Sequence, residues 1–156
     1  MHSAWYLLTQ ACSAEIKAVA AAMSVGWLEN PALPIDLGVA GPDGVGAKHS
    51  KALFVLQRGD RLEDQPGNVQ ERRRMRFVLG AVALGADGAQ QADLMHFAAR
   101  VRLREDAVWD RFRLVAPVQY LQEVEVERDL KDVAVAGIVL MSAFEIEYRQ
   151  TYTNAA

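Results

Sequence analysis

The sequence predicts an α+β domain of two layers, in which a mixed or antiparallel sheet of about four strands is covered by two helices. Residues 119–128 and 133–152 have strand periodicity, and a short polar break at 129–132 separates them, so we expect a hairpin. Two segments of helical periodicity supply the second layer. A length of 156 residues corresponds to one domain, which we expect to span 1–156.

The first helix is expected from Trp5 to Met23. Apolar side chains recur there every three or four residues, which is typical of an amphipathic helix, and Gly26 stands where the helix can end. Cys12 belongs to this stripe, so we expect a small core side chain, with a reactive thiol as the alternative. No Lys or Arg precedes the apolar run, so we do not expect an export signal.

A long loop is expected at 30–50, because this segment contains three prolines and four glycines. Its glycine-rich run, 38–46, superficially suggests a phosphate-binding loop. No strand leads into the run, however, and no Gly-Lys-Ser/Thr sequence ends it. We therefore expect a turn here rather than a nucleotide site.

Two further strands are expected at 51–57 and 72–84. The connection between them, 59–71, is too long for a tight hairpin, and its many charges and its Pro-Gly-Asn run predict an exposed, extended loop. We expect this loop to be mobile in the free subunit. The tripeptide Arg58-Gly59-Asp60 matches an adhesion motif, but a turn is the better interpretation of three residues.

The second helical region is expected from about 86 to 112, with a possible break near Glu105. Asp87 can cap it, with Gln90 three residues later as in a capping box. We expect one apolar stripe to face the sheet. The stripe consists of Leu94, Phe97 or Ala98, Val101, Val108 and Phe112.

Residues that could support catalysis or bind a metal are few. His96 has Asp93 and Arg100 at helical spacing, but no second ligand stands at metal spacing, so we expect a solvated histidine and no metal or other cofactor. The sequence contains no Gly-x-Ser-x-Gly nucleophile motif. We therefore expect no serine nucleophile of that kind.

The overall charge favours no particular partner, since 17 basic residues balance 20 acidic ones. We expect no nucleic-acid specificity. No apolar run approaches the ~20 residues that a membrane helix needs, so we expect no membrane partner. An electrostatic partner must therefore meet a local patch.

The C-terminal strands carry rows of glutamates. Strict alternation places Glu123, Glu125 and Glu127 on one face of the first strand, and Glu145 and Glu147 share a face of the second. Residues two apart on a strand are about 6.6 Å apart, so such a row is costly when buried without cations. A solvated face is the ordinary interpretation. The alternatives are a surface that meets a basic partner and a small enzyme that uses the glutamate cluster with a divalent metal.

A basic row exists in the same chain, because Arg72, Arg74 and Arg76 alternate onto one face of their strand. If the basic and acidic rows pair within one subunit, they form ordinary cross-strand pairs. If they lie at opposite edges of the subunit, they join neighbours head to tail, and such a contact makes a ring when it closes. The sequence leaves both arrangements open.

A resemblance to a known family covers roughly 52–152. The features that carry it are the run Ala52-Leu53-Phe54-Val55, the segment from Gly59 to Asn68 with its Asp-Gln-Pro-Gly-Asn sequence, a strand from 73 to 84, a helix, and the closing run Phe144-Glu145-Ile146-Glu147-Tyr148-Arg149. In this order they resemble the tail terminator (tail completion, minor tail) proteins of long-tailed bacteriophages.

The resemblance implies a structural virion protein that is not an enzyme. It implies an α/β fold, a location in the virion tail and assembly in the cytoplasm of the bacterial host. It implies a homohexameric ring that caps the tail tube protein, stops its polymerisation and presents a surface to the head-tail connector or stopper protein. A neck or head-tail joining protein is the alternative. The candidate contacts with a neighbouring subunit or with the tube are Arg58, Asp60, Arg61, Leu62, Glu63, Asp64, Arg72, Arg74, Arg76, Glu123, Glu125, Glu127, Glu145 and Glu147.

Overall fold

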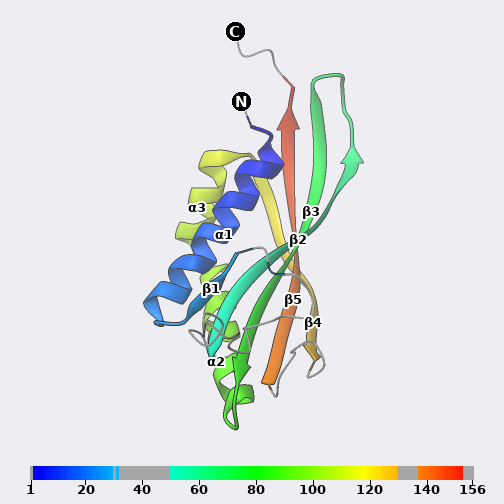
Figure 1. Ribbon diagram of the computed structural model, residues 1–156. Coiled ribbons are helices and arrows are strands. Elements are labelled where there is room, and N and C mark those ends of the chain that lie inside the picture. Colours follow the sequence, from blue (N-terminus) through cyan, green and yellow to red (C-terminus); the bar gives the residue numbers. More distant parts are fainter. Residues whose placement is uncertain (1, 30, 32–49, 130–136, 153–156) are drawn as a thin grey trace.

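The computed structural model describes residues 2–29, 31, 50–129 and 137–152, with the backbone alone at 120, 125–129 and 137. Three helices lie on one side of a five-stranded mixed sheet (Figure 1). The predicted α+β fold of two layers is confirmed, with one more strand and one more helix than expected. The predicted loop at 30–50 lies almost entirely outside the described residues.

Helix α1, Ala4–Ala22, matches the predicted first helix. The hydroxyl of Ser3 accepts a hydrogen bond from the backbone N–H of Tyr6 at 3.2 Å, which caps the first turn. The middle of the predicted stripe is buried against the core, from Leu8 to Val19, while Trp5 and Met23 at its ends are partly buried. Cys12 within it is fully buried as expected. The chain leaves the helix through Ser24, which has a positive φ of 56°, and enters the short strand β1, Gly26–Leu28.

The second helical region is two helices, α2, Gly88–Arg102, and α3, Asp106–Val115. The chain therefore breaks at Glu105, where the sequence allowed a break. Asp87 occupies the N-cap position of α2, but its side chain makes no capping hydrogen bond, so the predicted capping box is wrong.

The predicted apolar stripe is right for α3 and wrong for most of α2, where the alternative position Ala98 is partly buried against the core. Val108 and Phe112 of α3 are fully buried, whereas Leu94, Phe97 and Val101 of α2 are 51%, 61% and 45% exposed. Helix α2 instead turns a face of mostly small residues toward the sheet, because small side chains let a helix pack closely. That face consists of Gly88, Ala92, Met95, His96 and Ala99.

Four long strands follow β1 in the chain, and the order across the sheet is β1-β2-β3-β5-β4. Strand β1 is parallel to β2, and every other neighbouring pair is antiparallel. The predicted C-terminal hairpin is confirmed by the pairing of β4 with β5. The long strands are β2, Lys51–Asp64, β3, Gln70–Leu84, β4, Val118–Asp129, and β5, Gly137–Thr151.

The predicted long loop at 59–71 is wrong, because β2 continues to Asp64 and β3 begins at Gln70. Two register shifts, between Gln57 and Gly59 and between Leu62 and Asp64, interrupt the alternation that would have indicated a strand. The paired extension, residues 58–76, is called the distal hairpin below. It reaches past the end of the helix layer (Figure 1).

Both faces of the sheet contain buried apolar side chains. Leu53 and Val55 of β2 pack in the cluster that includes the helices, while Ala52 and Phe54 belong to a second cluster, which alternation places on the other face. Above these clusters, the distal hairpin carries mainly charged residues. No helix in the described ranges is long and apolar enough to span a membrane.

Candidate functional site

The distal hairpin and the adjoining part of β5 bring together all the predicted contact residues except the three glutamates of β4. Strand β5 pairs with β3 along its whole length, so Arg74 lies opposite Glu147 and Arg76 lies opposite Glu145. Leu62 is 46% exposed on the hairpin. The site is therefore a charged surface built from three neighbouring strands.

The basic row of β3 pairs with β5 within one subunit. The guanidinium of Arg74 lies 3.3 Å from a carboxylate oxygen of Glu145, 3.3 Å from one of Glu147 and 3.7 Å from one of Glu63. Arg72 lies 3.7 Å from Glu147. The hydrogen bond to Glu147, together with the charges of Glu63 and Glu145, raises the pKa of Arg74 above its ordinary value. Cross-strand pairs of this kind contribute about 0.2 to 1 kcal/mol each.

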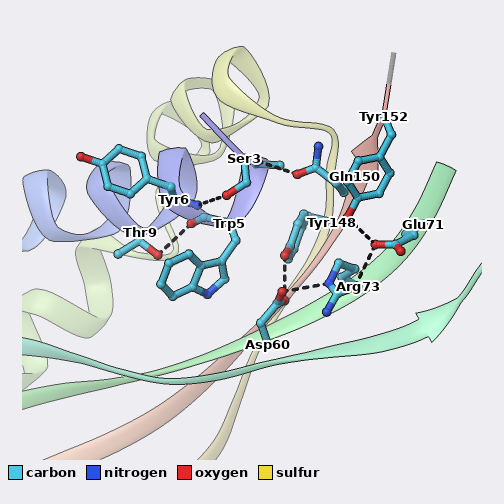
Figure 2. A network of polar contacts seen from close by, with 11 residues as sticks. Ser3, Trp5, Tyr6, Thr9, Asp60, Glu71, Arg73, Tyr148, Gln150 and Tyr152 are labelled. Carbon is cyan, nitrogen blue, oxygen red and sulfur yellow. Dashed lines mark hydrogen bonds and ion pairs between the residues drawn. The ribbon is translucent and has the colours of Figure 1, made fainter. Parts of the chain in front are cut away.

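A second network lies on the helix-facing side of the same strands (Figure 2). The carboxylate of Asp60 accepts hydrogen bonds from the hydroxyl of Tyr148 at 2.7 Å and from Nε of Arg73 at 2.8 Å. Arg73 also donates to Glu71 at 2.8 Å, and the hydroxyl of Tyr152 donates to the same carboxylate at 2.9 Å. Burial, and then the Asp60 carboxylate, raise the pKa of Tyr148. This network attaches the distal hairpin to β5.

The glutamates of β4 do not form one row. A register shift separates Glu123, which pairs with Phe144, from Glu125, which pairs with Ala143. Phe144 belongs to the apolar cluster under the helices, whereas Ala143 belongs to the cluster on the other face. Glu127 follows Glu125 after the shift. The prediction of a single acidic face is therefore wrong, because a β-bulge reverses the alternation between the first and second glutamate.

Glu123 binds to the helix layer instead. Its two carboxylate oxygens accept hydrogen bonds of 2.7 Å from Nε and Nη2 of Arg100, and Arg104 lies 3.5 Å away. Burial alone raises the pKa of Glu123, but the bonds and charge of Arg100 outweigh it and hold the pKa below its ordinary value. This residue connects β4 to α2, so the structure gives it a role inside the subunit.

Two depressions open on the charged surface. The first has a volume of about 300 Å³, and four arginines, Arg58, Arg61, Arg74 and Arg76, line it together with Asp60 and Glu145. The second, of about 290 Å³, lies nearer the hairpin tip and is lined by Asp64, Glu71, Arg72 and Arg149, among others. The first depression is the more basic of the two.

His96 is not solvated, which corrects the prediction. It is 3% exposed, and its Nε2 is hydrogen bonded to the hydroxyl of the buried Ser142 on β5. The face of α2 that packs on the sheet includes this residue. Among the described residues, no group of three or more His, Cys, Asp and Glu side chains could hold a metal ion.

Glu15 is a nearly buried charged residue that the sequence patterns did not indicate. The side chain of Glu15 is 9% exposed on α1 and accepts hydrogen bonds from Arg102 at the end of α2 and from Arg111 of α3. These bonds join the three helices. No local pattern indicates them, because the partners are 87 and 96 residues away in the chain.

Comparisons with known proteins give a limited result. No protein-family model matches the sequence, and no curated protein matches it. The chain is similar in structure to one chain of the virion of a native gene transfer agent (GTA) particle, with 14% identity and a TM-score of 0.45 over 88% of this chain and 91% of that chain. Similarity at this level does not establish a shared function.

Proposed function

We propose that this chain is a structural virion protein of a phage-like tail, a tail terminator that forms a ring at the end of the tail tube. The resemblance of 52–152 to that family supports the proposal. The observation that carries it is the presence of two open edges on one sheet. In this proposal the chain is a structural component that binds neighbouring proteins, and no catalysis is needed.

The first open edge belongs to β2. Strand β1 pairs only with 52–54 of β2, so within the described residues no strand pairs with the outer side of 55–64. The second open edge is β4, since no strand in the described part of the chain lies beyond it on the other side of the sheet. Exposed edges of this kind readily pair with another chain.

The two edge strands run in opposite directions, because the three pairings between β2 and β4 are all antiparallel. If subunits are related by rotation about an axis roughly along the strands, β4 of one meets β2 of the next in antiparallel orientation. The sheet then continues from subunit to subunit. A head-to-tail contact that closes by rotation produces a ring, and six subunits is the number that the family resemblance implies.

The distal hairpin suits the proposed contact with the tube or with the head connector. It reaches past the helix layer and carries charges on both faces, so a neighbouring protein can reach it (Figure 1). The networks around Arg74 and Asp60 hold its shape before any contact forms. Preorganised surfaces lose less conformational entropy on binding.

The proposal is tested with particles assembled in the absence of this chain. We expect tail tubes that exceed their normal length and do not join heads, as measured by electron microscopy. Tubes of normal length that fail to join heads would favour the neck or head-tail joining protein. Normal tubes on normally joined heads would refute both.

A further inference from the structure

We infer that Arg58 and Arg61, at the outer edge of β2, bind the glutamate-rich strand β4 of a second copy of this chain. The inference rests on the proposed ring and names the two surfaces that meet in it. It differs from the pairing expected from the sequence, in which Arg72, Arg74 and Arg76 would meet the β4 glutamates.

The basic surface is accessible and incompletely neutralised. Arg58 stands at the register shift between Gln57 and Gly59, and a bulge re-aims the side chain of the extra residue. It lines the larger depression, and no hydrogen bond or ion pair joins it to any other described residue. The side chain of Arg61 is 66% exposed, and Glu63, two positions along the same strand, is its one ion-pair partner among the described residues.

The acidic groups of that depression are already engaged. Asp60 accepts hydrogen bonds from Tyr148 and Arg73 on the other side of the sheet, and Glu145 is 3.3 Å from Arg74. Positive charge therefore remains in excess at the edge of β2. Guanidinium groups bind carboxylates through paired, charge-assisted hydrogen bonds, so a carboxylate-bearing segment is the ligand class that fits.

Such a segment stands at the opposite edge of the same sheet. Strand β4 contains four acidic residues within 123–129, and of these Glu123 is bound to Arg100 inside the subunit. Glu125 and Glu127 follow the bulge that separates them from Glu123 in the register. Glutamates two residues apart on a strand repel each other, and a cationic neighbour offsets that repulsion.

A second copy is the favoured partner because each subunit has arginines in the strand at one edge of the sheet and glutamates in the strand at the other, and these two strands run in opposite directions. Every subunit can then donate its basic edge to one neighbour and its acidic edge to the other. A contact of this type is heterologous, and it is satisfied throughout only when the ring closes.

The test uses two charge-reversed variants of the full chain, Arg58→Glu with Arg61→Glu and Glu125→Lys with Glu127→Lys. Assembly is measured at low salt by native mass spectrometry and sedimentation. The protein concentration is one at which the unchanged chain forms its ring, either by itself or on the tail tube. We expect each variant alone to assemble at least about tenfold more weakly, because like charges then meet at every interface. Arg113→Glu is the matched control, since its side chain on α3 is 57% exposed and pairs with Asp110, and it should assemble normally.

Mixing the two variants in equal amounts is the experiment that decides whether the two edges meet. Each interface in an alternating ring then joins opposite charges, so we expect assembly to return, with even numbers of subunits. Raising ionic strength from 0.01 to 1 M shortens the screening length from about 30 to about 3 Å and should weaken the unchanged ring. Circular dichroism of each variant is the control that tests whether it is folded.

Normal assembly of either variant alone would overturn the inference, and so would folded variants that do not recover when mixed. Loss of assembly in the arginine variant with normal assembly of the glutamate variant would assign the basic edge to a different acidic protein. If the unchanged chain forms no ring either alone or on the tube, the proposed function itself fails, which is a distinguishable result.

Discussion

Glu15→Gln should destabilise the helix layer, because Glu15 is the one carboxylate that the structure shows bound by arginines of both α2 and α3. One oxygen accepts 2.9 Å hydrogen bonds from Arg102 and from Arg111, and the other is also bound by Arg111. The carboxylate is nearly buried, whereas the two arginine side chains are 33% and 45% exposed. The substitution keeps the shape of the side chain and removes its charge.

The expected loss in unfolding free energy is about 2 kcal/mol. A hydrogen bond to a charged group contributes about 1.5 to 3 kcal/mol, but the bonds share one carboxylate, and the half-exposed arginines regain water when it is lost. For a chain of this size, a loss of that magnitude lowers the melting temperature by about 4 to 8 °C. Glu105→Gln is the control, because its side chain is 45% exposed and 3.5 Å from the same Arg102. We expect it to cost less than about 0.5 kcal/mol.

The pH dependence gives a second measurement. The hydrogen bond from Arg111 outweighs burial, and with the contribution of Arg102 it lowers the pKa of Glu15 below its ordinary value of 4.5. A group with a lowered folded-state pKa stabilises the fold fully above its unfolded pKa and loses that contribution as pH falls through the folded pKa. The gap between the unchanged protein and Glu15→Gln should therefore be constant near pH 7 and close below pH 4.5. Equal melting temperatures for Glu15→Gln and Glu105→Gln, or a gap that persists at low pH, would refute this reasoning.

Three further predictions concern the core and the distal hairpin. Gly80→Ala should lower the unfolding free energy by about 1 to 3 kcal/mol in urea denaturation, because a Cβ there would lie 2.0 Å from the ring of Phe54. Gly59→Ala should have little effect, because no atom beyond the adjacent residues would lie within 4 Å of its Cβ, and equal losses would contradict the account. Cys12 should resist thiol reagents at pH 8 until the protein is unfolded, since burial raises its pKa, and rapid labelling of the folded chain would be inconsistent with this. Asp60→Ala should accelerate amide hydrogen exchange in the distal hairpin while the lower part of the sheet stays protected. The substitution removes one bond that joins the hairpin to β5, from Tyr148, and one that joins the two strands of the hairpin, from Arg73, and unchanged exchange would count against that role.

Periodic segments of the fold could be predicted well. The stripe of α1 and the alternation of β5 are local patterns, and α1, β4 and β5 each begin and end within a few residues of the expected positions. The expected alternation of β4 fails at its bulges. Local spacing fixes which side chains share a face as long as the backbone stays regular. The distal hairpin was missed because its two bulges shift the alternation, so its sequence has the composition and pattern of a loop.

The sequence identified charged residues that the structure brings together, but not the contacts that they make. The arginines of β3 and the glutamates of β5 were identified as charged rows, and the structure pairs them with each other. The sequence had offered the β4 glutamates as partners of the arginines. The bulge after Glu123 moves the next glutamates out of that row, and Glu123 itself binds Arg100.

By itself, the sequence determined the fold class, the positions of most helices and strands, and the concentration of charge in a few strands, because these depend on spacing over a few residues. Only the tertiary structure decided which face of α2 is buried, since that choice depends on how closely a helix face of mostly small residues can approach the sheet. It also decided the partners of the charges. Glu15 meets Arg111 and Arg74 meets Glu147 across 96 and 73 residues of chain, and separations of that length are set by the sheet order and by the packing of helices on it.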